Sequence, residues 1–204
     1  MPIRTFDYCA LQFLNQWLEK ESNYCDALAQ DSPDVQRTAL LGAAAHFRIA
    51  RNLPTKYELK QNHQRYQPVI EVLNGLGEVN PANVEHVVEE THQAISQRYG
   101  NRRVLSLVTK FLWLKVKLPV RIYDRQARIA LGTQEGDYPS FNNEFSTRFD
   151  KCAKEIDRAC ENLKSVLPYT VKPAMTAFDV DTLVKQQWFK ERVLDIYLWN
   201  EGNT

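Results

Sequence analysis

Hydrophobic residues recur along this chain at steps of three and four positions, which is the spacing of one face of an α-helix. The alternation of apolar and polar residues that is typical of strands is nearly absent. The pattern predicts an all-α fold of about eight helices in a single domain, residues 1–204. A split into two helical lobes with a cleft is compatible with it. The clearest helical run contains Phe145, Phe149, Cys152, Ile156, Cys160, Leu163 and Leu167.

Cap residues predict where several helices begin and end. A serine before Pro33, a capping box from Thr55 to Glu58 and an asparagine before Pro81 are start signals. Gly100 is a stop signal. Besides the run above, helices are predicted over about residues 5–28, 33–52, 55–74, 81–100 and 102–116, in a short stretch from Asp124, and over about 181–199.

Charge is concentrated in one part of the chain. Between Arg98 and Arg128 there are nine Lys or Arg residues and a single acid, Asp124, although the whole chain has 26 bases and 25 acids. The segment therefore carries a net charge of +8, and the rest of the chain carries a net charge of −7. Phe111, Trp113 and Tyr123 are interleaved with the cations, so the segment should pack as part of the fold. A basic surface fixed on a core can bind phosphates, although a solvated charged face is the plain alternative.

The helix predicted over residues 102–116 has a distinctive polar side. Apolar residues make one broad face, and the opposite side places a lysine beside a tryptophan. A lysine stem lying over an indole is a structural explanation of this pair. The residues that share the polar side are Ser106, Thr109, Lys110, Trp113 and Lys117.

Asp124 stands where the extended "LPVRIY" gives way to the helical "DRQARIAL". Aspartate is a preferred N-cap, so a capping role explains the residue by itself. A fixed carboxylate also suits cleavage of an N-glycosidic bond, because positive charge develops on the sugar in the transition state. The two roles are compatible.

The stretch "LPVRIYDRQARIAL" resembles the segment of helix-hairpin-helix DNA glycosylases in which a proline and an extended run lead to the catalytic aspartate. "SLVTKFLWL" is similar to the second hairpin helix of that family. The resemblance covers residues 98–131 and makes Asp124 and Lys110 the candidate catalytic residues, Lys110 lying near the family's Schiff-base lysine. It implies duplex DNA with a flipped base as partner, a monomer and no cofactor. Similar divergent enzymes include a phage-defence glycosylase that removes glucosylated hydroxymethylcytosine.

Two departures from the family change these expectations. The family's hairpin turn is rich in glycine, whereas this one has only Gly100, so Arg102 and Arg103 are expected to replace backbone amides at the phosphates. Lys110 precedes Asp124 by 14 positions, a shorter separation than in the family, and no iron-sulfur motif follows. We therefore expect a monofunctional enzyme that uses water. The other candidate DNA-binding residues are Lys117, Arg121, Arg125 and Arg128.

A flipped base requires an aromatic face and polar contacts at its edge. Tyr123 and Trp113 are the candidates for the face and Ser106 for a polar contact, with Trp188 as a further aromatic, although each aromatic could equally belong to the core. A non-catalytic helical nucleic-acid-binding protein, and an interaction domain whose basic patch meets an acidic protein, remain alternative functions.

The cysteines, the histidines and the lengths of the apolar runs argue against metal-binding, secreted and membrane-spanning proteins. The four cysteines are widely spaced without a C-x-x-C pair, which argues against zinc and iron-sulfur sites and predicts reduced, buried thiols. The four histidines lie in unrelated surroundings, so no metal site is expected. Nothing near the start resembles a signal peptide, and no apolar run is long enough for a membrane span. A soluble, cytoplasmic protein is expected.

Overall fold

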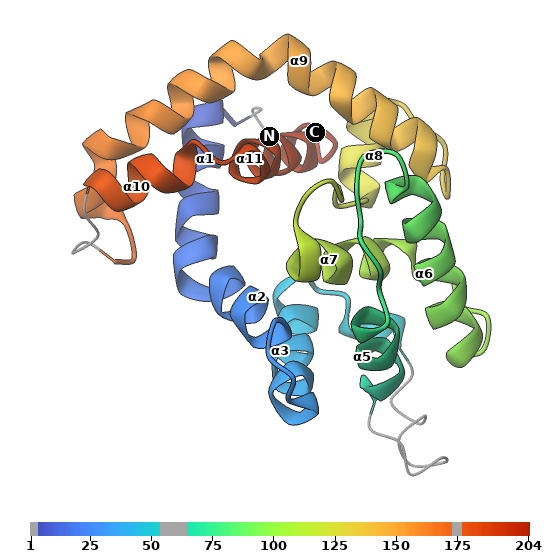
Figure 1. Cartoon of the computed structure of the whole chain (residues 1–204). Helices are drawn as coiled ribbons and strands as arrows, with labels where there is room; N and C mark the ends of the chain where they lie inside the picture. The colour runs from blue at the N-terminus through green and yellow to red at the C-terminus, as the bar shows by residue number, and fades with distance from the viewer. Residues whose placement is uncertain (1–3, 54–64, 173–176) are drawn as a thin grey trace. The chain divides into compact units, whose positions relative to one another are not determined.

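The computed structural model describes residues 4–53, 65–172 and 177–204 and is helical throughout these ranges, in which no strand occurs (Figure 1). The prediction of an all-α fold is confirmed. A π-helical segment, Trp17–Glu21, joins α1 to α2, and 3₁₀ turns cover Ala50–Asn52 and Leu163–Tyr169. The α-helices are α1 (Phe6–Gln16), α2 (Ser22–Leu28), α3 (Pro33–His46), α5 (Gln67–Asn74), α6 (Val84–Arg98), α7 (Leu105–Val116), α8 (Arg125–Leu131), α9 (Tyr138–Asn162), α10 (Ala177–Val184) and α11 (Gln187–Glu201).

The chain forms two compact units. The terminal unit consists of Met1–Lys20 and Tyr123–Thr204, and the central unit of Glu21–Ile122. The expectation of one domain over residues 1–204 stays a prediction. None of the helices in the described ranges has the length and apolar composition that a membrane span requires.

The terminal unit is built around α11. This helix contacts α1, α8, α9 and α10, and the long α9 arches over α1 and α11 (Figure 1). Most side chains of α11 are buried, which is typical of a core helix rather than a surface helix. The Phe13 and Phe189 rings, 4.8 Å apart between centroids, join α1 to α11.

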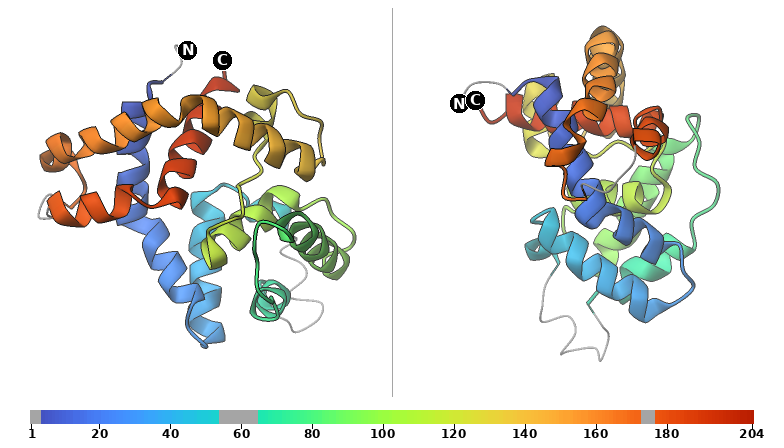
Figure 2. Two further views of the ribbon diagram at one scale, coloured as in Figure 1. Left: turned by 45° about the horizontal axis from the view of Figure 1, so that its top comes forward. Right: turned by 90° about the vertical axis from the view of Figure 1, so that its left-hand side faces the viewer.

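The central unit packs α2 on α3 and α6 on α7, and the first of these pairs runs side by side in both views of Figure 2. Paired side-chain amides of Gln36 and Asn74, at 3.1 and 3.0 Å, connect α3 to the end of α5. The apolar side of α7 is fully buried, with Leu107, Phe111 and Leu112 wholly inaccessible. Burial of large apolar side chains of this kind supplies most of the free energy of folding.

Several predicted boundaries need correction. Pro33 begins α3 as expected, but α6 begins at Val84 rather than at Pro81, because the Asn80 side chain accepts the Ala82 amide in a turn before the helix. The helix predicted over residues 5–28 contains the π-helical segment. The helix predicted over 181–199 is two helices, α10 and α11, and the one predicted over 145–167 is α9 followed by a 3₁₀ turn. The capping box from Thr55 to Glu58 lies outside the described residues.

The cysteines are free thiols, as expected. Cys9, Cys25 and Cys160 are buried, and Cys152 is half-buried. Burial raises the pKa of Cys9 and Cys160 to about 12 and that of Cys25 to about 11. These three side chains therefore stay protonated near neutral pH and act as small apolar groups.

Candidate functional site

The basic segment begins with a turn between the two packed helices α6 and α7. Gly100 and Asn101 both have positive φ, at 80° and 58°, and the Asn101 amide donates to the Ser96 carbonyl at 2.9 Å. This bond closes a Schellman motif, for which glycine is suited because it has no Cβ. The Val104 amide donates to His92 Nε2 at 3.4 Å and so joins the start of α7 to α6. The arrangement is a helix–turn–helix hairpin in the central unit.

Arg102 and Arg103 follow this turn and are both exposed. They lie between the end of α6 and the first turn of α7, so the hairpin carries two guanidinium groups at its tip. A role of these two residues in DNA contacts stays a prediction.

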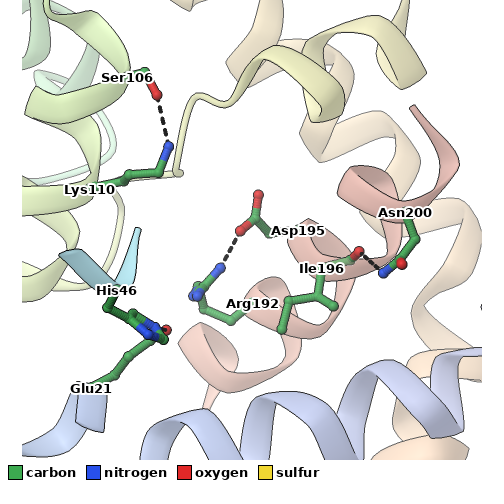
Figure 3. Close-up of polar contacts among 8 residues, drawn as sticks. All are labelled: Glu21, His46, Ser106, Lys110, Arg192, Asp195, Ile196 and Asn200. Atoms are coloured by element: carbon green, nitrogen blue, oxygen red, sulfur yellow. Dashed lines mark hydrogen bonds and ion pairs between the residues drawn. The ribbon is translucent and has the colours of Figure 1, made fainter. Parts of the chain in front are cut away.

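The middle of the polar side of α7 is buried, although Ser106 and Lys117 at its two ends are half-buried. Lys110 is 4% exposed, and its Nζ donates to Ser106 Oγ, one turn earlier, at 2.8 Å (Figure 3). Thr109 and Trp113 are also buried, the latter at 2% exposure. Because charged side chains are rarely buried without polar partners, Lys110 belongs to an organised polar site rather than to a solvated surface.

The chain leaves α7 through an irregular turn. Lys117 has a φ of 57°, and its amide donates to the Trp113 carbonyl at 2.7 Å, which ends the helix. The Leu118–Pro119 peptide is cis, and the backbone then runs without helix to Asp124. Lys117 and Arg121 are half-buried in this stretch. The predicted extended run "LPVRIY" thus starts with a turn at Leu118 and Pro119, and its remaining residues are outside any helix.

Asp124 is the N-cap of α8 in the terminal unit. Its backbone is extended, at φ −124° and ψ 149°, and its carboxylate accepts the Gln126 amide at 3.0 Å. The Asp124 carbonyl accepts the Arg128 amide at 2.9 Å, which starts the helix. The side chain is half-buried and the next residue, Arg125, is exposed. The capping role predicted from the sequence is confirmed, and the positive end of the helix faces the carboxylate.

Tyr123 is fixed in the core of the terminal unit. Its ring meets Phe141 edge-on at 5.1 Å between centroids. Its hydroxyl accepts the Gly136 amide at 2.8 Å and donates to the Gln134 carbonyl at 3.4 Å. These contacts fix the loop between α8 and α9, so they give Tyr123 a structural role beside its predicted part in base binding.

Arg128, another predicted DNA contact, donates to the Thr133 carbonyl at 2.9 Å and helps to close the end of α8. Of the sequence-predicted residues, Asp124, Tyr123, Arg125 and Arg128 belong to the terminal unit. The central unit contains Arg102, Arg103, Ser106, Lys110, Trp113, Lys117 and Arg121. Among these seven, Lys110 Nζ donates to Ser106 Oγ, and the Lys117 amide donates to the Trp113 carbonyl.

Two polar pairs with buried carboxylates were not predicted from the sequence (Figure 3). In the terminal unit, Arg192 and Asp195 of α11 form an ion pair at 5% and 6% exposure, and the Arg192 guanidinium lies over the Phe13 ring. In the central unit, Glu21 is wholly buried, and its Oε1 lies 3.1 Å from Nε2 of the half-buried His46. Buried ionisable groups concentrate at functional sites, although they also occur in purely structural networks.

Comparisons with protein-family models, with curated proteins and with solved structures found no match to this chain. No three His, Cys, Asp or Glu side chains are grouped as metal ligands within the part of the chain that the structure describes.

Proposed function

We propose that this protein is a monofunctional DNA glycosylase in which Asp124 stabilises the developing positive charge on the sugar and orients the attacking water. The observation that carries the proposal is the fixed Asp124 carboxylate, held by a helix-end amide at 3.0 Å at the end of an extended segment. A preorganised anion needs no reorganisation when charge develops, and this is the largest contribution in many enzymes. The resemblance to helix-hairpin-helix glycosylases supports the same role.

The hairpin between α6 and α7 supports DNA as the partner. Its tip exposes Arg102 and Arg103, and the segment from Arg98 to Arg128 carries the local charge of +8. Guanidinium groups pair well with phosphate oxygens, and their contacts are independent of base sequence.

We expect the double substitution Arg102→Ala and Arg103→Ala to weaken binding to all DNA sequences alike. Loss of two phosphate contacts should lower the slope of log K against log salt concentration by about 2. Titration of labelled duplexes at several salt concentrations measures both effects. The control is Lys151→Ala with Lys154→Ala, which removes the same charge from exposed positions of α9. Equal affinity and slope in the arginine variant and the wild type would contradict the role of the hairpin.

Lys110 is expected to form no covalent intermediate. Lys110 is buried with its Nζ donating to Ser106 Oγ, and it precedes Asp124 by 14 positions, a shorter separation than in the glycosylase family. Borohydride treatment of the protein with a cleavable duplex should therefore trap no adduct. A trapped adduct that disappears in Lys110→Ala would show a lyase instead.

The proposed substrate is a modified base, and the glucosylated hydroxymethylcytosine of phage DNA is the first to test because similar divergent enzymes excise it. The experiment incubates the protein with unmodified, lesion-containing and phage-modified DNA and counts the abasic sites. We expect abasic sites in one class of DNA only. Intact DNA in all classes would refute the glycosylase proposal.

A second function is favoured by one observation. The hydrogen bond between Asp124 and Gln126 is that of an ordinary N-cap, which requires no chemistry at this residue. A non-catalytic DNA-binding protein would use the same hairpin and the same basic segment. The same experiment separates the two functions, because only the glycosylase leaves abasic sites in DNA that it binds.

A further inference from the structure

The helix that Asp124 caps has little apolar anchoring of its own. α8 is seven residues long, and Ala127 is its one buried side chain. Helices of this length are unstable in isolation, so contacts with the rest of the terminal unit must set its position. The nearest of these contacts come from the C-terminal end of α11 and from α9.

Gly202, directly after α11, lies against the backbone of the first turn of α8. A Cβ at position 202 would be 2.7 Å from the carbonyl carbon of Gln126 and 3.0 Å from its Cα, with the carbonyl oxygen closer still. These are backbone atoms, so they cannot rotate away as a flexible side chain can. Gln126 is also the residue whose amide donates to the Asp124 carboxylate. Glycine at 202 therefore allows the end of α11 to lie against the α8 backbone at Gln126, the residue whose amide holds the Asp124 carboxylate.

Arg148 of α9 holds the other end of α8. Its Nη1 lies 2.8 Å from Glu201 Oε2, and its Nη2 donates to the Ala130 carbonyl at 3.4 Å. One guanidinium thus joins the last turn of α8 to the last residue of α11, and a cation at the C-terminal end of a helix is electrostatically favourable. Since Glu201 precedes Gly202 in the chain, the two contacts act on α8 together.

We infer that Gly202, Arg148 and Glu201 are positioning residues that fix α8 and thereby the Asp124 carboxylate. The consequence for catalysis rests on the proposed function, whereas the placement of the carboxylate does not. Misplacement of a catalytic group by about 1 Å can cost about a hundredfold in rate, so these contacts matter even though they touch no substrate.

The test uses Gly202→Ala in the full-length protein, with Gly77→Ala as the matched control. Gly77 lies between α5 and α6, has no atom within 4 Å of an added Cβ, and undergoes the same chemical change. Hydrogen exchange of the Gln126 amide reports the bond to Asp124 without any substrate. We expect its exchange to be about tenfold faster in Gly202→Ala and unchanged in Gly77→Ala, with both proteins folded by circular dichroism.

Excision and binding are then measured separately. At saturating DNA, Gly202→Ala should excise its base at least about tenfold more slowly, while its dissociation constant for DNA stays within about twofold. Arg148→Met should show the same split between rate and binding, and Arg148→Lys should restore part of the rate because the charge beside Glu201 returns. If these residues act on stability alone, the variants should have a lower melting temperature but should not excise more slowly at unchanged DNA affinity.

The outcomes distinguish the inference from the proposed function. Unchanged exchange at Gln126 in both Gly202→Ala and Arg148→Met would overturn the positioning role, whatever the activity. Faster exchange together with a wild-type protein that excises no base would support the positioning of Asp124 and refute the glycosylase.

Discussion

Asp124→Asn is expected to fold and to bind DNA, yet to excise bases about a hundredfold to a thousandfold more slowly than the wild type. Asparagine is about as good an N-cap as aspartate, so α8 should keep its start and its bond from the Gln126 amide. The substitution removes only the negative charge that a cationic transition state requires. A loss of this size corresponds to about 3 to 4 kcal/mol of transition-state stabilisation.

A second aspartate provides the control for this experiment. Asp137 caps α9 in the same unit, and its carboxylate accepts the Ser140 amide at 2.9 Å. Asp137→Asn makes the same change at the same kind of position and should excise at the wild-type rate. Similar rates in Asp124→Asn, Asp137→Asn and the wild type would leave Asp124 as a helix cap without a catalytic role.

The largest effect on stability is expected from Asp195→Asn, which should lower the free energy of unfolding by about 3 kcal/mol or more. The substitution removes the charge of the carboxylate that pairs with the buried Arg192 guanidinium, which also lies over the Phe13 ring. Breaking a buried ion pair costs more than the pair contributes, because one charge remains desolvated. Urea denaturation followed by circular dichroism measures the change.

Asp181→Asn is the matched control for that measurement. Asp181 pairs with Lys164 and Lys185 at the surface of the same unit, and hydrogen bonds from both lysines lower the pKa of its carboxyl. Its contribution to stability is therefore present above the pKa of the unfolded carboxyl and is lost as the pH falls through the lower folded value. Solvent screens such pairs, so Asp181→Asn should have a much smaller effect. Equal effects at the two positions would mean that the Arg192–Asp195 pair is solvated in solution.

Local signals in the sequence were sufficient where structure depends on neighbouring residues. The proline that begins α3, the stop at Gly100 and the Asp124 cap each follow from one residue and its immediate surroundings. The helical character of the chain follows in the same way from the spacing of its apolar residues. Asp124 could thus be identified as both a cap and a candidate site residue.

Features that depend on distant contacts could not be predicted. Glu191, Arg192 and Asp195 look like the polar face of a surface helix, but α11 is covered on most sides and buries all three. Glu21 meets His46 across 25 positions of the chain, and the two ends of the chain share one unit. The need for glycine at 202 comes from Gln126, far away in sequence. No local pattern encodes such partners.

The proposed release of a base from DNA through Asp124 is tested most directly by a time course with wild type and Asp124→Asn on the same phage-modified DNA. Mass spectrometry identifies the free base, and a separate assay counts the abasic sites. We expect equal amounts of free base and abasic sites with the wild type, and a release at least about a hundredfold slower with Asp124→Asn at unchanged DNA binding. Equal release by the two proteins, or DNA bound by the wild type without release of any base, would contradict the proposed role of Asp124.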